Sequence, residues 1–371
     1  MTNDMLGLIN LREDTPIYEL NEHRPLATAP IGGRFRLIDF TLSNMVNAGI
    51  QDVGLLLPAA SRSILDHIRS GKEWGLARKS DGLFYMPLEP HDIAKPDEGD
   101  VTDYYRNLLF VKRGNRKYIL ISDGHTVENI DFDEVLHFHR RHNADVTMVY
   151  QVMPKDCQDA GYSLTIGEDD RVTAVSAQDS FQEGDNLYQR NVLVDTEVFQ
   201  HLIRRSHVKG YKRLIEDVLK QNIGRLRVFG FKHTGYAKRV SSLTSYFQVN
   251  MDLLHPKLWQ ELFMKDSQHH IYTKIKDEAP AKYMEEAHVT NSIIANGCII
   301  EGRVENSVLF RKVKVGRNTV IRNSIIMQHT IVGDNADLNY VACDKSTIIQ
   351  PEAVLAGTKE QPLCISKRSV L

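Results

Sequence analysis

Residues 309–338 read LFRKVKVGRNTVIRNSIIMQHTIVGDNADL, and their apolar spacing decides the fold of the C-terminal part of the chain. An apolar residue recurs every six positions, first at Leu309, Val315, Ile321 and Met327, and after a one-residue slip at Ile326, Val332 and Leu338. Glycines punctuate the turns at Gly297, Gly302, Gly316 and Gly333. This period predicts a left-handed parallel β-helix of hexapeptide repeats, with three or four coils. A β-sandwich is the alternative, but longer strands of strict alternation are absent.

Upstream of this stretch, strand and helix patterns alternate. Strands are expected at 5–10, 53–57, 118–122 and 146–152, and helices at 35–48, 64–69, 133–143 and 196–206. The alternation predicts an α/β fold with a doubly wound, mostly parallel, Rossmann-like sheet. Ligands of such sheets bind beyond the carboxyl ends of the strands, where the loop after residue 10 and residues 122–125 are expected. We expect three segments: an α/β domain over 1–264, a linker over 265–287 and the β-helix over 288–371.

Composition excludes several classes of function. The 371 residues carry a net charge of −2, which gives no basic field for nucleic acid or for a membrane surface. No apolar run reaches the roughly 20 residues of a membrane helix, and the N-terminus has no positively charged leader, so a cytoplasmic location is expected. The four cysteines are too widely spaced for a zinc pattern.

Two further segments carry a family resemblance. Residues 30–44 read PIGGRFRLIDFTLSN, and residues 118–133 read YILISDGHTVENIDFD. Together with 246–254 (YFQVNMDLL) and the hexapeptide region, they resemble the ADP-glucose pyrophosphorylase (glucose-1-phosphate adenylyltransferase) family. The resemblance implies a nucleotidyltransferase domain followed by a β-helix. It also implies Mg²⁺-dependent formation of ADP-glucose and diphosphate from ATP and glucose 1-phosphate, in glycogen synthesis.

The phosphate loop of that family is missing. The family has a glycine-rich turn after the first strand, where backbone N–H groups approach the phosphates closely. The matching stretch here, residues 9–15 (INLREDT), contains no glycine. Glu13 and Asp14 would also repel a triphosphate, so we expect no ATP binding of the family's kind.

Both metal positions of the family are altered. The family's Ser-Gly-Asp-His appears as Ser122-Asp123-Gly124-His125, and a one-residue shift on extended chain turns a side chain to the other face. The second metal aspartate is replaced by Arg239, which either supplies a fixed positive charge or lies solvated on a loop. No metal site is therefore expected in this chain. His125 is expected to be structural.

The resemblance also places vestiges of a sugar-phosphate site. Gly99 matches a glycine-rich turn, and Asn191 lies in the strand that lines the sugar in the family. The family's Glu-Lys-Pro segment has no match, so most contacts to glucose 1-phosphate are expected to be lost.

A chain that keeps the fold of the family but has altered catalytic residues resembles the non-catalytic, GlgD-type subunits of the family. This implies a regulatory or structural subunit without a cofactor of its own, in a heterotetramer with a catalytic subunit that carries the Mg²⁺. The alternative is an active enzyme with rearranged ligands, Asp123 with Asp131 or Asp217. A third reading, from the β-helix alone, is a hexapeptide acyltransferase using His288 or His329.

An effector site is the remaining expectation. Arg34 and Arg36 precede an expected helix N-terminus, where the helix dipole favours anions. In the bacterial family a lysine at the position of Arg34 contributes to the site of a phosphorylated activator. Lys367 and Arg368 are candidates to join it.

Overall fold

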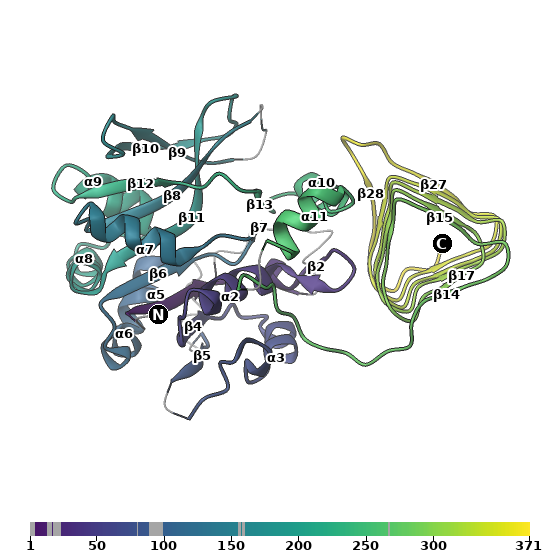
Figure 1. The fold of residues 1–371 in the computed structure, drawn as a ribbon, viewed down its shortest axis with the longest axis horizontal. Coiled ribbons are helices and arrows are strands. Elements are labelled where there is room, and N and C mark those ends of the chain that lie inside the picture. The colour runs from purple at the N-terminus through teal and green to yellow at the C-terminus, as the bar shows by residue number, and fades with distance from the viewer. Residues whose placement is uncertain are drawn as a thin grey trace. The chain divides into compact units, whose positions relative to one another are not determined.

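The computed structural model describes residues 4–12, 17, 24–79, 81–88, 99–154, 157, 160–265 and 268–371. Glu13 and Asp14 lie outside the described residues. Contacts divide the chain into two compact units (Figure 1). The first unit holds the described residues of Met1–Asp14, Phe40–Arg239 and Asp266–Tyr272, and the second holds those of Thr15–Asp39, Val240–Lys265 and Thr273–Leu371. Neither unit is continuous in sequence.

The first unit is built on a nine-stranded sheet with the path β10-β9-β11-β6-β1-β4-β5; β8 pairs with β11, and β12 pairs with β8. Strands β6, β1, β4 and β5 are parallel neighbours, whereas β11 runs antiparallel to β6. The strands are β1 (Met5–Asn10), β4 (Asp52–Leu56), β5 (Gly82–Met86), β6 (Tyr118–Ser122), β8 (Val146–Val152), β9 (Gly161–Ile166), β10 (Val172–Gln178), β11 (Asn186–Asp195) and β12 (Val228–Lys232). A short second ladder pairs β7 (Thr126–Glu128) with β13 (Ala237–Arg239).

Helices cover both faces of this sheet, which is why the central strands are buried throughout. Leu8 and Ile121 lie in the core cluster of the face covered by α5, α6 and α8. Gly7 lies on the opposite face, where a Cβ would come 2.7 Å from the Met45 sulfur of α2. The helical segments are α2 (Leu37–Asn47), α3 (Arg62–Ile68), η2 (Lys72–Trp74), α5 (Asp100–Arg106), α6 (Leu108–Gly114), α7 (Phe132–Arg141), α8 (Thr196–Val208), the π-helical turn η3 (Leu214–Leu219) and α9 (Lys220–Asn222).

In the second unit, a hairpin includes the first two residues of the helix expected over 35–48. The Gly32-Gly33 turn, with φ of +54° and +80°, pairs β2 (Pro30–Ile31) with β3 (Phe35–Arg36). The expectation that the helix starts at residue 35 is therefore wrong, because α2 begins at Leu37. The Arg36 N–H donates to the Asp39 carboxylate at 2.9 Å, so a side chain of the protein already accepts the hydrogen bond at this N-terminus. The unit also contains η1 (Leu26–Thr28), α10 (Leu243–Asp252) and α11 (Pro256–Phe263).

The C-terminal part is a left-handed parallel β-helix with a triangular outline in Figure 1, as the hexapeptide period predicts. It has five coils rather than the expected three or four. Its first sheet is β14 (Lys282–Tyr283), β17 (Ile299–Ile300), β20 (Lys314–Val315), β23 (Ile331–Val332) and β26 (Ile348–Ile349). The second is β15 (His288–Thr290), β18 (Arg303–Glu305), β21 (Val320–Arg322), β24 (Asp337–Asn339) and β27 (Val354–Ala356). The third is β16 (Ile293–Ile294), β19 (Val308–Leu309), β22 (Ile325–Ile326), β25 (Val341–Cys343) and β28 (Leu363–Ile365).

One side of the third sheet is covered within the second unit. Val308 and Ile325 are fully buried, although their neighbours Leu309 and Ile326 are the residues that fill the β-helix core. Segment 24–36 lies against this side, since a Cβ on Gly33 would come 3.0 Å from Ile293.

Residues with left-handed backbone form the corners of the β-helix. One corner is a column of Gly297, Lys312, His329, Ser346 and Arg368, all with positive φ. The residues just before them define what we call the corner column: Asn296, Arg311, Gln328, Lys345 and Lys367. Each step of this column is tied by a backbone hydrogen bond, such as that from Arg368 N–H to the Lys345 carbonyl at 3.1 Å. Corner-column residues in successive coils are therefore about one strand spacing, roughly 4.8 Å, apart.

Candidate functional site

Asp123 follows the carboxyl end of β6, and Arg239 reaches it from β13. The antiparallel β7–β13 ladder places Arg239 opposite Thr126, three residues beyond Asp123. The Arg239 Nε–H donates to Oδ2 of Asp123 at 2.9 Å, and the two side chains are only 18% and 10% exposed. Arg239 is therefore neither solvated nor on a loop.

The charge of Arg239 controls the ionisation of Asp123. Burial alone would raise the pKa of the Asp123 carboxyl, but Arg239, with His125 and Arg190 adding, lowers that pKa to about 2. Burial lowers the pKa of His125 to about 4, so its fully buried imidazole is neutral at neutral pH. The His125 backbone N–H donates to the other oxygen of Asp123 at 3.0 Å, and Gly124 between them has a φ of +72°. One oxygen of Asp123 thus accepts the hydrogen bond of a local turn, and the other forms an ion pair with Arg239.

A Mg²⁺ ion does not fit this arrangement. It would need several oxygen ligands, whereas both oxygens of Asp123 already accept hydrogen bonds and a cation fills the second ligand position. No group of three or more His, Cys, Asp or Glu suited to a metal occurs in the described part of the chain. Asp131 instead caps α7 by accepting from Asp133 N–H at 2.8 Å, and Asp217 accepts from two backbone N–H groups at 2.8 Å.

Arg12 lies beyond the carboxyl end of β1, where the family resemblance expects a phosphate loop. Its guanidinium donates to the carbonyls of Leu57, Met86 and Pro87 at 3.1, 3.1 and 3.2 Å, and forms an ion pair with Asp103. These carbonyls follow the ends of β4 and β5, which is where ligands of parallel sheets bind. The Arg12 side chain is 8% exposed. A cation of the protein itself therefore lies at these strand ends, a feature that the sequence did not reveal.

Gly99 and Asn191, which the resemblance predicts to be remnants of a sugar site, make internal contacts as well. A Cβ on Gly99 would lie 2.3 Å from the Lys212 carbonyl, so the residue allows close packing of α5 against segment 212–214. Asn191 is buried, and its Nδ2 donates to Oε1 of Glu128 at 2.7 Å.

Glu128, which sequence reasoning missed, is a carboxyl buried on β7. Burial raises its pKa to about 8, the Asn191 hydrogen bond opposes this, and the charge of Asp123 adds to it. Among the described residues, neither Oε2 of Glu128 nor Oδ1 of Asn191 has a hydrogen-bond partner. A proton on Oε2 would suit this pair, since an amide and a carboxylic acid are complementary.

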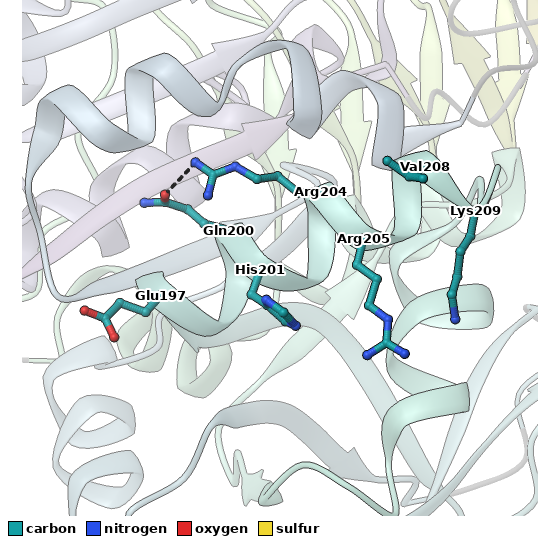
Figure 2. A pocket seen from close by; sticks show the side chains of 7 residues that line it. All are labelled: Glu197, Gln200, His201, Arg204, Arg205, Val208 and Lys209. Atoms are coloured by element: carbon teal, nitrogen blue, oxygen red, sulfur yellow. Dashed lines mark hydrogen bonds between the residues drawn. The ribbon is translucent and has the colours of Figure 1, made fainter.

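Two hollows of the first unit differ in size and in enclosure. One, of about 250 Å³, is lined by Asp100, Tyr162, Arg190, Arg213, Ile215 and Glu216. This is below the roughly 300–1,000 Å³ of typical small-molecule sites. The other, of about 620 Å³, is an open hollow along α8. Figure 2 shows that its side chains leave the same helix side by side, and only Gln200 and Arg204 are joined by a hydrogen bond.

Positive charge gathers in the second unit. Arg34 is exposed and lies over the Phe35 ring at 5.3 Å, and Arg36 is half-buried. Burial lowers the pKa of Arg311, Glu278 opposes this, and Arg34 adds to the lowering. Burial likewise lowers the pKa of Lys276, with Arg311, Lys274 and Arg36 adding. The expected pair Arg34 and Arg36 is thus part of a larger basic cluster at the corner column.

Comparisons with known proteins define the class. Residues 15–224 match the family model described as nucleotidyl transferase, and residues 279–362 match the one described as GlmU-like, C-terminal hexapeptide. The fold and these matches place the chain in the nucleotidyl transferase family, with a hexapeptide β-helix as its C-terminal part.

Within that class, the chain belongs to the GlgD family. It is 39% identical over 369 residues to the glycogen biosynthesis protein GlgD of Bacillus subtilis (strain 168), covering 98% of this chain and 96% of the relative. It is also 39% identical to the GlgD of Geobacillus stearothermophilus, covering 100% and 98%. The glucose-1-phosphate adenylyltransferase of Clostridium botulinum (strain Eklund 17B / Type B) is 32% identical, covering 80% and 77%.

Proposed function

We propose that this chain is a regulatory or structural subunit of a glucose-1-phosphate adenylyltransferase of glycogen synthesis, located in the cytoplasm. The observation that carries the proposal is the Arg239–Asp123 ion pair at the end of β6. Nucleotidyl transfer requires a bound triphosphate and a metal ion that neutralises developing charge. Two arginines hold the places where these would bind, so the chain alone forms no ADP-glucose.

None of the helices in the described ranges is long and apolar enough to cross a bilayer.

The test is ADP-glucose formation from ATP, glucose 1-phosphate and Mg²⁺. The chain is assayed alone and mixed with the glucose-1-phosphate adenylyltransferase chain of the same organism, with native mass measured for the mixture. We expect no product from the chain alone, a heterotetramer in the mixture, and a changed rate or effector response. Robust activity of the chain alone would overturn the proposal.

The rearranged-ligand alternative is discriminated by Asp123→Ala. An active enzyme would lose several orders of magnitude in rate, whereas the proposed subunit loses none, because it has none alone. The positions of Asp131 and Asp217 count against the alternative, since each accepts hydrogen bonds from backbone N–H groups of its own segment. Geometry gives the acyltransferase reading no support either, because His329 forms a corner of the β-helix and His288 Nδ1 lies 2.9 Å from the Glu286 carbonyl oxygen.

We also propose that the basic cluster around Arg34 and Arg36 binds a phosphorylated effector. Support comes from the cations that converge there from segment 24–36, segment 274–276 and the corner column. Arg34→Gln should weaken the binding of inorganic phosphate, measured by calorimetry on the full chain. Lys314→Gln is the matched control, because Lys314 is an exposed cation on another side of the same β-helix. Equal affinities in both variants would contradict the effector site.

A further inference from the structure

One side of α8 carries a row of basic side chains that faces solvent. His201, Arg205 and Lys209 are exposed and four residues apart, so they leave the same side of the helix. Figure 2 shows them next to one another along the open hollow of about 620 Å³. Glu197 is the only acid among the described residues that line this hollow. Within the described ranges, none of the three basic side chains forms an ion pair.

Exposed apolar side chains border this row. Val208 lines the same hollow and is 84% exposed. The ring of Tyr105 on α5 stacks on that of His207 with 3.9 Å between the centroids, and Tyr105 is itself 39% exposed. Leu109, at the start of α6, is 57% exposed. The helix dipole stabilises cations in the last turn of a helix, but it does not account for exposed apolar side chains beside them. Grouped apolar side chains at a polar surface are typical of a protein-binding site.

We propose that this side of α8 is a docking surface for an acidic α-helix of a partner protein. Residues four apart on a helix are about 6 Å apart, so carboxylates at every fourth position of the partner match the spacing of His201, Arg205 and Lys209. Rows of this spacing are the ridges by which neighbouring helices pack. An apolar residue of the partner beside its acidic row would cover Val208. The surface involves neither a nucleotide nor a metal, so the inference does not rest on the proposed function.

The charges of the hollow favour an acidic helix over other polyanions. A nucleic acid carries phosphates along its whole length and would bring them against Glu197 at one end of the row. An anionic membrane surface is recognised by clusters of about 4–8 lysines and arginines, whereas the hollow has Arg204, Arg205 and Lys209. Arg204 is also held by Gln200, with 3.1 Å between its Nη2 and the amide oxygen. A short partner that carries both carboxylates and an apolar side chain matches this mixture.

The experiment measures binding of a fluorescein-labelled peptide to the full chain by fluorescence anisotropy. The peptide is an alanine-based helix of about four turns, with glutamate at every fourth position and leucines beside that row. A second peptide has the same composition with the glutamates scrambled. We expect the ordered peptide to bind at least about tenfold more tightly than the scrambled one, and its affinity to fall as salt rises.

Charge reversal tests the basic row itself. The double variant Arg205→Glu/Lys209→Glu should bind the acidic peptide at least about tenfold more weakly, because like charges then face each other. It should also bind a peptide in which lysines replace the glutamates. The control is Arg62→Glu/Lys72→Glu, which makes the same change of net charge at exposed positions of α3 and η2 and should leave binding unchanged. Circular dichroism checks that both variants are folded, as expected for exposed positions.

Four outcomes would overturn the proposal. The first is that the acidic peptide does not bind the wild-type chain, and the second is that both double variants weaken its binding equally. The third is equal affinity of the ordered and scrambled peptides, since the spacing of the row would then have no part in recognition. The fourth is tighter binding of a single-stranded oligonucleotide or of phosphatidylserine vesicles than of the acidic peptide, since the surface would then serve another polyanion.

Discussion

The Nε atom of Arg239 lies 2.9 Å from Oδ2 of Asp123, so the end of β6 holds a fixed cation of the protein itself. A metal ion brings its charge only when bound and leaves when diluted, whereas a guanidinium on a paired strand stays. The carboxylate of Asp123 is thereby kept ionised in a buried setting without any ligand. The buried charge of Asp123 is thus balanced by a residue of the same unit.

Removing the cation should therefore destabilise the fold. In Arg239→Gln the buried Asp123 carboxylate loses its partner, and breaking a buried pair typically costs about 3–5 kcal/mol. Urea denaturation of the wild type, both single variants and the Arg239→Gln/Asp123→Asn double variant gives the coupling energy. We expect the double variant to be more stable than Arg239→Gln alone. Strictly additive effects would show that the two side chains do not act as a pair.

Removing the charge of Arg12 should destabilise the fold about as much as removing that of Arg239. Arg12→Met keeps a long side chain but loses the Asp103 ion pair and three hydrogen bonds to carbonyls. The free energy of unfolding should fall by about 2–4 kcal/mol, since buried acceptors lose their donors. The control is Arg62→Met, whose ion pair with Asp66 is 95% and 72% exposed and should contribute almost nothing. Equal unfolding midpoints for both variants would refute the assigned role of Arg12.

The raised pKa of Glu128 predicts how the stability of the fold depends on pH. Its pKa is raised from 4.5 to about 8 in the fold, so the native state binds the proton more tightly than the unfolded state. The stabilisation that Glu128 gives the fold is fully present below pH 4.5 and is lost as the pH rises toward 8. Glu128→Gln cannot titrate, and its amide suits the unpartnered Oδ1 of Asn191.

The measurement compares Glu128→Gln with the wild type in thermal unfolding at pH 5 and pH 8. From pH 5 to pH 8, the stability of the variant relative to that of the wild type should rise by an amount on the order of a few kcal/mol. A difference that stays constant with pH would mean that Glu128 titrates normally.

The close approach of two coils at Gly302 allows a test of how tightly the β-helix packs. A Cβ there would lie 2.4 Å from the Thr319 carbonyl of the next coil, so Gly302→Ala forces two backbones apart. We expect a loss of about 2 kcal/mol or more. Gly224→Ala is the control, because a Cβ at Gly224 meets nothing within 4 Å. If circular dichroism during heating gave equal midpoints for both, the coils would be looser than the structure indicates.

The buried parts of the fold were predictable from sequence. Strands β1, β6 and β8 have the predicted bounds, because strands covered on both faces consist of almost unbroken apolar residues. The coil count was underestimated at the ends of the β-helix. Residues 282–283 of the first coil are exposed and polar or aromatic, and the excursion at residues 357–362 breaks the period in the last coil.

The chemistry at the strand ends was only half predictable. Sequence comparison could show that Arg239 replaces an acid, but not that it bonds to Asp123, 116 residues away. The Arg12–Asp103 pair spans 91 residues and has no local pattern at all. Contacts of this kind are set by the packing of distant strands, which composition and periodicity do not encode.

The two buried ion pairs also bear on how such a chain changes through evolution. To match the catalytic pattern of the family, a descendant would have to lose Arg12 and Arg239 and acquire a glycine loop and a second carboxylate. Each first step leaves Asp103 or Asp123 without its cation and lowers stability before any activity returns. If the chain has the non-catalytic role proposed above, the two pairs would make that role difficult to reverse by single substitutions.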